Sequence, residues 1–487
     1  MKTVRDMTAR VQRPVRVLQF GEGNFLRAFA DCMIDIANEK GVFDGSIAVV
    51  KPKATGSVAR FQQQDCVYTV VIRGRQDGQT VDSARIVTSI DAVYHPQEDY
   101  DAWMALAAAD TLQFVISNTT EAGIVLDRND HYDGLPESFP GKLTKFLYAR
   151  YEAFHASAAA GVTMLPTELI EGNGAALRAC VLALSELWKL PDGFRSWLND
   201  ACTFCSTLVD RIVTGFPKEN PEALYEKLGY RDELADIAEP FGLWVIEGGN
   251  DTLRERLPLQ QAGQPVIFTD DLCPYRERKV RVLNGAHTAT MLAGYLCGFD
   301  IVRDCMRDAQ MGTLIRRVVM QEIVPFVPLP PEQTQGFASS VFERFDNPYI
   351  DHALLSISLN SVSKWRTRVL PSFRENFAAN GCLPRLLTFS FAALLAFYRS
   401  CDLRDDGLHA RRADGTQYLV HDGGDVLRTF AAHAGESDHN YVAAIASDTA
   451  LWGGDLSRYE NFTQTVAQWV GALCADPQVA LARVLGS

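Results

Sequence analysis

Short apolar runs alternate with helical patterns through the first half of the chain. Runs rich in β-branched residues predict strands at Val15–Phe20, Ser46–Val50, Tyr68–Arg73, Phe114–Ser117 and Thr163–Leu165. Between several of them, apolar residues recur at helical spacing and predict helices, notably at Phe25–Glu39 and Leu143–Ala160. This alternation is typical of a parallel sheet covered by helices.

After about Thr269 the strand patterns almost vanish. Helical spacing predicts helices at Val280–Cys297, Gly312–Ile323, Leu386–Arg399 and Tyr441–Leu451. The loop Pro258–Pro274, rich in proline and glycine, is the predicted boundary. We therefore expect an α/β protein with a doubly wound N-terminal domain at residues 14–265 and a mainly α-helical domain at 270–487. The active site is expected in the cleft between them. The extension Asp402–Asn440 is interpreted as surface loop.

Composition and charge narrow the function. The 487 residues are 47% hydrophobic and 22% charged, as in an ordinary globular protein. With 60 acidic and 47 basic residues, the net charge of −13 argues against nucleic acid and anionic membranes as partners. The polar N-terminus and the lack of a long apolar run indicate a cytoplasmic protein. The 11 cysteines show no disulfide or zinc spacing, so we expect no metal.

A glycine turn follows the first strong strand. Gly21 and Gly23 stand between an apolar strand and an amphipathic helix, the context of a dinucleotide fingerprint. Gly21 permits the tight turn, and Gly23 lets a pyrophosphate approach the backbone at the helix N-terminus. The third glycine of the fingerprint is missing, because Leu26 stands there. A plain strand-to-helix turn therefore remains the alternative to a Rossmann-like nucleotide site.

The spacing does not decide between NAD and NADP. An acidic residue is expected at the end of the second strand, about 20 residues after the glycine turn. Lys51 and Lys53 occur there instead. Lys51 could face the 2′-phosphate of NADP, or it could be a solvated strand end.

A second polar group interrupts the apolar helix pattern near residue 280. Lys279, Asn284 and His287 fit one side of an α-helix, with Asn284 about 140° and His287 about 80° from Lys279. A lysine at a pocket wall loses solvation and its pKa falls toward the range useful for proton transfer. An amide and an imidazole beside it can hold a substrate oxygen. A solvated lysine and two satisfied core residues fit the same spacing.

Three further polar segments occupy strand ends or apolar runs. Glu168 and Asn173-Gly174 lie between a strand and a helix, where ordinary turn chemistry is the alternative. Asp210-Arg211 interrupts an apolar run, and an internal ion pair is the alternative there. The segment Ser117–Gly123, which contains Asn118 and Glu121, follows a strand and suits a ribose or nicotinamide contact.

Together these motifs resemble a known family. QFGEGNFLRAF, SNTTEAG, ELIEGNG, TLVDRIV and KVRVLNGAHTA, in this order and spacing, are similar to the mannitol dehydrogenase family of polyol-specific long-chain dehydrogenases. The resemblance covers nearly the whole chain. Within the family the closer likeness is to members that act on sugar acids, and it is carried by FCSTLVDRIVTGFP and RFDNPYIDHALLSISLNSVSKWRTRVLP.

The resemblance implies a role for each matching residue. Lys279 corresponds to a metal-independent general acid and base, with NAD as the cofactor. Asn173 and Asn284 correspond to residues that polarise the substrate oxygen, and His287 to one that positions substrate and lysine. Asp210 falls at a position near the substrate. The expected cofactor-binding residues are Phe20, Gly21, Gly23, Asn24, Phe25, Asn118 and Glu121.

The expected substrate is a hexuronate or its reduced hexonate. Lys364, Arg366, Arg368 and Arg374 form a basic stretch without an acidic residue before Arg374. If its start is helical, Lys364 and Arg368 share a face, and one of them binds the substrate carboxylate; a solvated basic face is the alternative. The same chemistry on another hexuronate or on mannitol, and a nucleotide-binding sensor without catalysis, also remain open. The sequence leaves monomer and dimer undecided.

Overall fold

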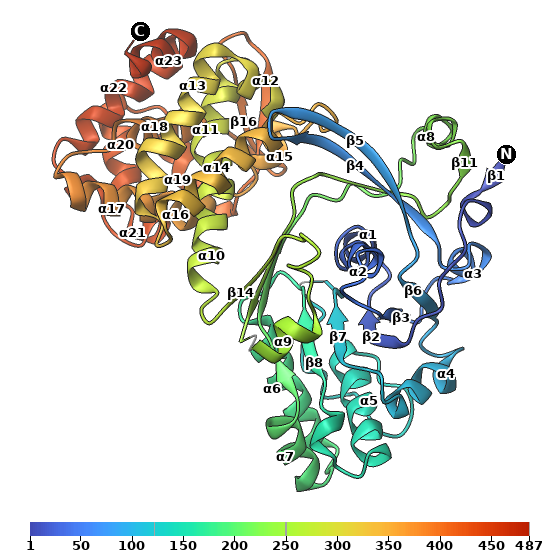
Figure 1. Cartoon of the computed structure of the whole chain (residues 1–487). Coiled ribbons are helices and arrows are strands. Elements are labelled where there is room, and N and C mark those ends of the chain that lie inside the picture. Colours follow the sequence, from blue (N-terminus) through green and yellow to red (C-terminus); the bar gives the residue numbers. More distant parts are fainter. Residues whose placement is uncertain (121, 249–250, 487) are drawn as a thin grey trace. The chain divides into compact units, whose positions relative to one another are not determined.

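The chain folds into two compact units. The computed structural model describes residues 1–120, 122–248 and 251–486 (Figure 1). Unit 1 comprises Met1–Arg73 and Thr80–Leu272. Unit 2 comprises Cys273–Ser487 together with the short segment Gly74–Gln79.

A six-stranded parallel sheet is the centre of unit 1. Its spatial order is β6 (Ile90–Tyr94), β3 (Ser46–Val50), β2 (Val15–Phe20), β7 (Phe114–Ser117), β8 (Thr163–Pro166) and β9 (Thr203–Phe204). All neighbouring strands are parallel. The chain enters in the middle at β2 and builds outward on both sides, which creates a switch point between β2 and β7. The expected α/β fold class, a Rossmann-like sheet followed by a mainly helical region, is confirmed.

Both faces of this sheet are buried. Val17, Val49 and Ile116 enter one apolar cluster, and their strand neighbours Leu18 and Val50 enter another on the opposite face. The sequences of these strands are therefore continuous apolar runs rather than alternating apolar and polar positions. The helices of unit 1 are α1 (Asn24–Arg27), α2 (Ala30–Glu39), α3 (Ala59–Gln63), α4 (Tyr100–Met104), α5 (Phe139–Ala153), α6 (Asn173–Leu187), α7 (Asp192–Asp200), α8 (Pro221–Leu228) and α9 (Asp251–Arg256).

Several expectations for unit 1 were wrong in detail. The single helix expected at Phe25–Glu39 is divided at Phe29, whose backbone leaves the helical region with φ −125° and ψ −94°. The strand expected at Tyr68–Arg73 is β4 (Tyr68–Gln76), which lies outside the parallel sheet, between β12 (Asp236–Ala238) and β5 (Gln79–Val87). The expected boundary loop contains β14 (Val266–Thr269), which extends a sheet with β13 (Leu243–Glu247) and β10 (Thr207–Asp210).

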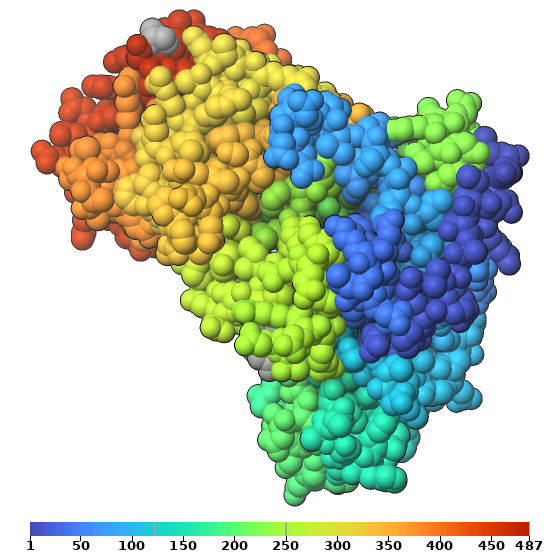
Figure 2. Space-filling model, viewed as in Figure 1, coloured from blue at the N-terminus to red at the C-terminus, as the bar shows by residue number. Residues whose placement is uncertain are grey.

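The first residues of the chain also belong to unit 1. Strand β1 (Lys2–Thr3) pairs in parallel with β11 (Tyr230–Arg231). The dark-blue N-terminal segment and the green segment that contains β11 accordingly lie side by side in both whole-chain views (Figures 1 and 2). Buried Val4 and Tyr230 pack together beneath this pair. The pairing fixes the N-terminus, which the sequence pattern left without structure.

Unit 2 is a helical bundle around α11 and α18. Nearly every residue of these two helices is buried. The other helices are α10 (Cys273–Arg278), α12 (Val302–Arg307), α13 (Ala309–Arg317), α14 (Pro331–Phe345), α15 (Leu354–Ile357), α16 (Ser361–Arg368), α17 (Leu370–Asn380), α19 (Gly424–His433), α20 (Asp438–Ser447), α21 (Thr449–Trp452), α22 (Phe462–Ala475) and α23 (Pro477–Leu485), with α11 at Gly285–Leu296 and α18 at Arg385–Phe397.

Two features of unit 2 differ from expectation. The extension read as surface loop is ordered: β15 (Asp402–Arg404), β16 (Gly407–Arg411) and β17 (Gln417–Val420) form an antiparallel sheet, followed by α19. Two of the expected α-helices contain π-helical segments, η4 (Lys279–Asn284) before α11 and η5 (Val318–Ile323) after α13.

The described residues contain neither a membrane-spanning helix nor a cluster of metal ligands. Within residues 1–120, 122–248 and 251–486, no helix combines the length and apolar character that crossing a membrane requires. Over the same ranges, no three His, Cys, Asp or Glu side chains are grouped as metal ligands would be.

Candidate active site

The glycine turn after β2 has the geometry that a dinucleotide requires. Gly21 has φ +127°, and a Cβ there would lie 2.7 Å from the carbonyl oxygen of Asn118, so only glycine fits. A Cβ on Gly23 would meet no atom within 4 Å, so the backbone at the start of α1 is open to a ligand. An open backbone at a helix N-terminus after a parallel strand fits a pyrophosphate.

The other expected cofactor residues differ in their surroundings. The Phe20 side chain is fully buried between Trp103 and Phe139, so Phe20 can meet a cofactor only through its backbone. Asn24 accepts a hydrogen bond from Arg27, and Phe25 stacks on Phe29 with ring centroids 4.8 Å apart. Asn118 donates its backbone N–H to the Phe20 carbonyl oxygen, which joins the ends of β2 and β7. Glu121 lies outside the described residues.

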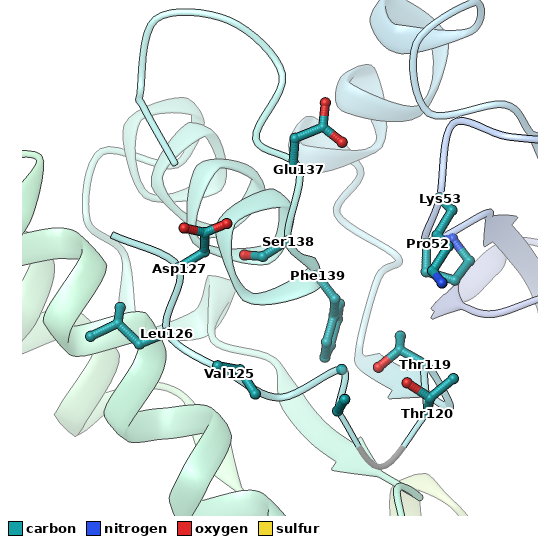
Figure 3. Close-up of a pocket in the computed structure, with 12 residues that line it drawn as sticks. Pro52, Lys53, Thr119, Thr120, Val125, Leu126, Asp127, Glu137, Ser138 and Phe139 are labelled. Carbon is teal, nitrogen blue, oxygen red and sulfur yellow. The ribbon is translucent and has the colours of Figure 1, made fainter. Parts of the chain in front are cut away.

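A cavity of about 460 Å³ opens beside these strand ends. Pro52 and Lys53 approach it from the loop after β3, and Thr119 and Thr120 from the loop after β7 (Figure 3). Phe139, the first residue of α5, points toward the same space (Figure 3). In open parallel sheets, ligands bind at the carboxyl ends of the strands next to the switch point. The cavity is therefore the candidate site for part of a dinucleotide.

Asn173 is buried and its amide is fully engaged. The side-chain NH₂ donates to the carbonyl oxygens of Pro166, Glu168 and Thr207, each at 3.0 Å. The side-chain oxygen accepts from the backbone N–H groups of Gly174 and Thr207, at 2.9 and 2.8 Å. These bonds join β8, α6 and β10. The predicted contact of Asn173 with a substrate oxygen stays a prediction.

Glu168 beside it supports the loop that follows β7. Its carboxylate accepts from the Ser117 hydroxyl and from the backbone N–H and hydroxyl of Thr119, all within about 3.0 Å. Burial raises the pKa of this carboxyl, and the bonds to Thr119 and Ser117 oppose the rise. Asp210, at the end of β10, is buried. Arg211 next to it donates to three backbone carbonyl oxygens, of Phe241, Ala28 and Pro240.

In unit 2, Lys279 and Asn284 are the two ends of the π-helical segment η4. The segment ends where the Gly285 N–H donates to the carbonyl oxygen of Val280, five residues earlier. An α-helix separates residues i and i+5 by about 140°, whereas a π-helix places them nearly one above the other. The predicted α-helical geometry is therefore wrong for this segment, and the π-helix gives Lys279 and Asn284 a common face.

Asn284 and His287 present polar groups on this face. Among the described residues, none makes a hydrogen bond with the Asn284 side-chain amide, in contrast to Asn173. The His287 ring stacks on Phe345, with centroids 4.2 Å apart, and meets the edge of the His352 ring at 5.2 Å. The His287 Nε2 atom is buried and has no hydrogen-bond partner within the described part of the chain.

Basic groups dominate the surroundings of His287. Burial lowers the pKa of His287 far below its usual value, and the next contributions come from His352, Arg344, Arg368 and Lys364. Burial also lowers the pKa values of Lys364 and Arg368, which lie one turn apart on α16. His287 is thus a neutral imidazole beside several cations. Sequence reasoning did not single out Arg344 or His352, although both lie in the stretch that carried the closer likeness, because only the fold brings them to His287.

Helix α16 is held at its first residue by a buried tyrosine. The Tyr398 hydroxyl accepts from the Ser361 N–H at 3.1 Å and donates to Asp422 at 2.7 Å. Asp422 also accepts from the Val362 N–H. A Cβ on Gly285 would lie 3.2 Å from the Arg368 carbonyl oxygen, so glycine allows the end of α16 to pack on α11. These contacts set the position of Lys364 and Arg368 relative to η4.

Not every basic residue near the motif belongs to this cluster. Arg281 makes two hydrogen bonds to Glu375 and lies 3.1 Å from Glu277, so its charge is neutralised. Arg366 donates to the carbonyl oxygen of Ala450. Summing charges along the segment around Lys279 therefore overstates how basic the site is. The cations whose charges act on His287 lie elsewhere, at Arg344, Lys364 and Arg368.

Fold and site together define a dinucleotide-binding protein with a Rossmann unit and a helical unit that carries a lysine, an asparagine and a histidine on one helix. The mannitol dehydrogenase Rossmann domain model matches residues 15–260, and the mannitol dehydrogenase C-terminal domain model matches residues 271–474. The chain belongs to the mannitol dehydrogenase family.

Relatives agree with this assignment over nearly the full length. The chain is 42% identical to an altronate oxidoreductase of Bacillus subtilis, over 94% of this chain and 92% of that one. It is 42% identical to an altronate oxidoreductase of Klebsiella pneumoniae, over 97% of both chains. A D-sorbitol dehydrogenase structure covers 99% of this chain and all of that one, with a TM-score of 0.78 at 21% identity. A Pseudomonas fluorescens mannitol 2-dehydrogenase in complex with NAD and D-mannitol covers 98% and 95%, with a TM-score of 0.65.

Proposed function

We propose that the protein is an NAD-dependent oxidoreductase that interconverts tagaturonate and altronate, without a metal ion. The observation that carries the proposal is the basic surrounding of His287, on which Arg368 and Lys364 of α16 both act. A neutral polyol has no group to match these cations, whereas a hexuronate has a carboxylate. The names of the relatives support the same substrate.

Lys279 is proposed as the proton donor and acceptor at the reacting oxygen. Bound at the strand ends of unit 1, NAD would supply the hydride acceptor for oxidation and, as NADH, the hydride donor for reduction. In altronate oxidation, the amine of Lys279 takes the hydroxyl proton as the C–H electron pair leaves, and in tagaturonate reduction the ammonium returns that proton. The Asn284 amide donates to the same oxygen, since η4 places both residues on one face. Neutral His287 positions the substrate, since burial keeps its pKa low.

The substrate carboxylate is assigned to Lys364 and Arg368 on α16. Arginine can form a bidentate ion pair with a carboxylate. Burial lowers the pKa values of both Lys364 and Arg368, so an anion bound beside them would stabilise their charged forms. Asp210 and Asn173 are also proposed to contact the substrate, as the family resemblance implies. Asn173 would do so after releasing one of its present hydrogen bonds.

The test compares substrates and two arginines of one helix. With NAD, wild-type enzyme should turn over altronate faster than mannonate or mannitol, and Arg368→Ala should raise the KM for altronate by about tenfold or more. Arg366→Ala is the matched control, because Arg366 lies on α16 but bonds to Ala450. Preference for mannitol or mannonate would refute the substrate assignment, and equal effects of the two variants would refute the role of Arg368.

The acid–base assignment has its own test. Lys279→Ala should abolish turnover, while NADH still binds with a Kd within about threefold of the wild-type value. Near-normal turnover in this variant would remove Lys279 from the mechanism. If the wild type binds NADH tightly but turns over none of the hexonates and polyols, the alternative of a nucleotide-binding sensor is favoured.

A further inference from the structure

The glycine turn and the end of β3 are joined by an ion pair. Lys51 directly follows β3, and its Nζ lies 2.9 Å from Oε1 of Glu22, the residue between the two glycines of the turn. The Lys51 side chain is 9% exposed and that of Glu22 27%. The backbone holds both partners, since the Gly21 N–H donates to the Val50 carbonyl oxygen at 3.1 Å and the Lys51 N–H to that of Tyr94 at 3.1 Å.

This pair lies at the strand end where Rossmann folds recognise the adenosine ribose of the dinucleotide. An acidic side chain at the end of the second strand accepts a hydrogen bond from the 2′-hydroxyl of NAD, whereas a basic residue there accommodates the 2′-phosphate of NADP. The order β6–β3–β2 makes β3 that second strand. The chain has a lysine at this strand end, where an acidic residue would mark a site for NAD.

We propose that Glu22 makes the site selective for NAD by neutralising Lys51 and by supplying the carboxylate that β3 lacks. The inference rests on the proposed dinucleotide function and is independent of the sugar substrate. The 2′-hydroxyl of NAD can donate to Glu22. The 2′-phosphate of NADP would bring further negative charge beside a carboxylate, and the cation that could balance it is already engaged by Glu22.

Other nearby charges do not replace this pair. Lys53 lines the cavity after β3 but is exposed, so solvent and salt screen its charge (Figure 3). A Cβ on Gly56 would lie 3.4 Å from Lys51 Nζ, so the exposed loop after β3 packs against the ammonium group. Lys51 is thereby confined near Glu22. Release of Lys51 to a phosphate requires the loss of the Glu22 charge.

The experiment measures cofactor binding without any sugar. Isothermal titration calorimetry gives the Kd of NADH and of NADPH for wild type, Glu22→Gln, and the double variant Glu22→Gln with Lys51→Met. Wild type should bind NADH about tenfold or more tightly than NADPH. Glu22→Gln should lower the NADPH Kd by about tenfold and raise the NADH Kd a few fold, and adding Lys51→Met should cancel the gain for NADPH.

Two further variants make the result decisive. Asp44→Asn removes the same charge from an exposed carboxylate of unit 1, 72% exposed, and should leave the NADH to NADPH ratio unchanged. Lys51→Met alone retains the Glu22 carboxylate and should keep the preference for NADH. An unchanged ratio in Glu22→Gln, a wild type that prefers NADPH, or a lost preference in Lys51→Met overturns the inference. If the wild type binds neither NADH nor NADPH, the proposed function is refuted together with this inference. If the wild type binds NADH selectively but does not turn over altronate, only the proposed substrate is refuted.

Discussion

Replacing Asn173 and Asn284 by alanine distinguishes a structural role from a catalytic one, although the family resemblance implied the same role at the substrate oxygen for both residues. The Asn173 oxygen accepts from the buried N–H groups of Gly174 and Thr207. A buried donor left without a partner costs about 1–3 kcal/mol, so Asn173→Ala should lose about 3 kcal/mol of unfolding free energy after some relaxation. For a unit of this size, that loss lowers Tm by about 6–12 °C.

Asn284→Ala should behave in the opposite way. Its amide is half-buried and, within the described residues, is not used by the protein, so Tm should change by about 1 °C or less. Loss of one donor to the reacting oxygen lowers kcat by roughly 100-fold or more. Differential scanning calorimetry and steady-state kinetics with altronate measure both quantities on the same preparations.

A third variant tests the chemistry of the Asn173 contacts. Asn173→Asp keeps an acceptor for the two N–H groups but turns an oxygen toward three carbonyl oxygens. Its Tm should lie below that of wild type at pH 7, and the difference should shrink at pH 5, where the protonated carboxyl can donate again. If Asn173→Ala melts together with wild type, the structural role of these five bonds is wrong.

Three other predictions address pH, positioning and metal. Because the folded state holds His287 neutral, only the unfolded state takes up a proton on this residue below about pH 6.5. The free energy of unfolding should therefore fall with decreasing pH, by up to about 1.4 kcal/mol per pH unit. In urea denaturation, His287→Gln should show a smaller dependence on pH than wild type, and an equal dependence would contradict this explanation. Tyr398→Phe removes the hydroxyl that holds Ser361 and Asp422, so the KM for altronate should rise roughly 3–10-fold with kcat within about twofold; a loss confined to kcat would contradict it. Dialysis against EDTA should leave kcat unchanged, and activity that zinc restores would refute metal independence.

The sequence pattern predicted the bounds of strands best where both faces of a sheet are buried. Strands β2, β3 and β7 have the predicted bounds because both sheet faces are buried, which gives short uninterrupted apolar runs. The sequence patterns did not predict β10, β13 or β15–β17. Strands β10 and β13 lie in a mixed sheet, and β15–β17 form a partly exposed antiparallel sheet, so pairing between strands decides their conformation.

The site was predicted in its residue types more than in its geometry. Lys279, Asn284 and His287 were recognised from spacing, but the π-helix that aligns the first two has no signal in apolar periodicity. Glu22 and Lys51 are 29 positions apart, and only the adjacency of β2 and β3 brings them together. Arg344 and His352 likewise depend on how α14 and the segment after it pack against α11.

The short segment Gly74–Gln79, at the turn between β4 and β5, has a consequence for synthesis. It belongs to unit 2: Arg75 pairs with Asp346 at 2.8 Å, and the Gly78 N–H donates to Glu343 at 2.6 Å. These partners lie 271 and 265 positions later in the chain. At ribosomal rates of about 5–20 residues per second, the turn waits on the order of tens of seconds for them. A gene fragment that starts at Cys273 would also lack this turn, so separate production of the helical unit calls for grafting these six residues rather than for simple truncation.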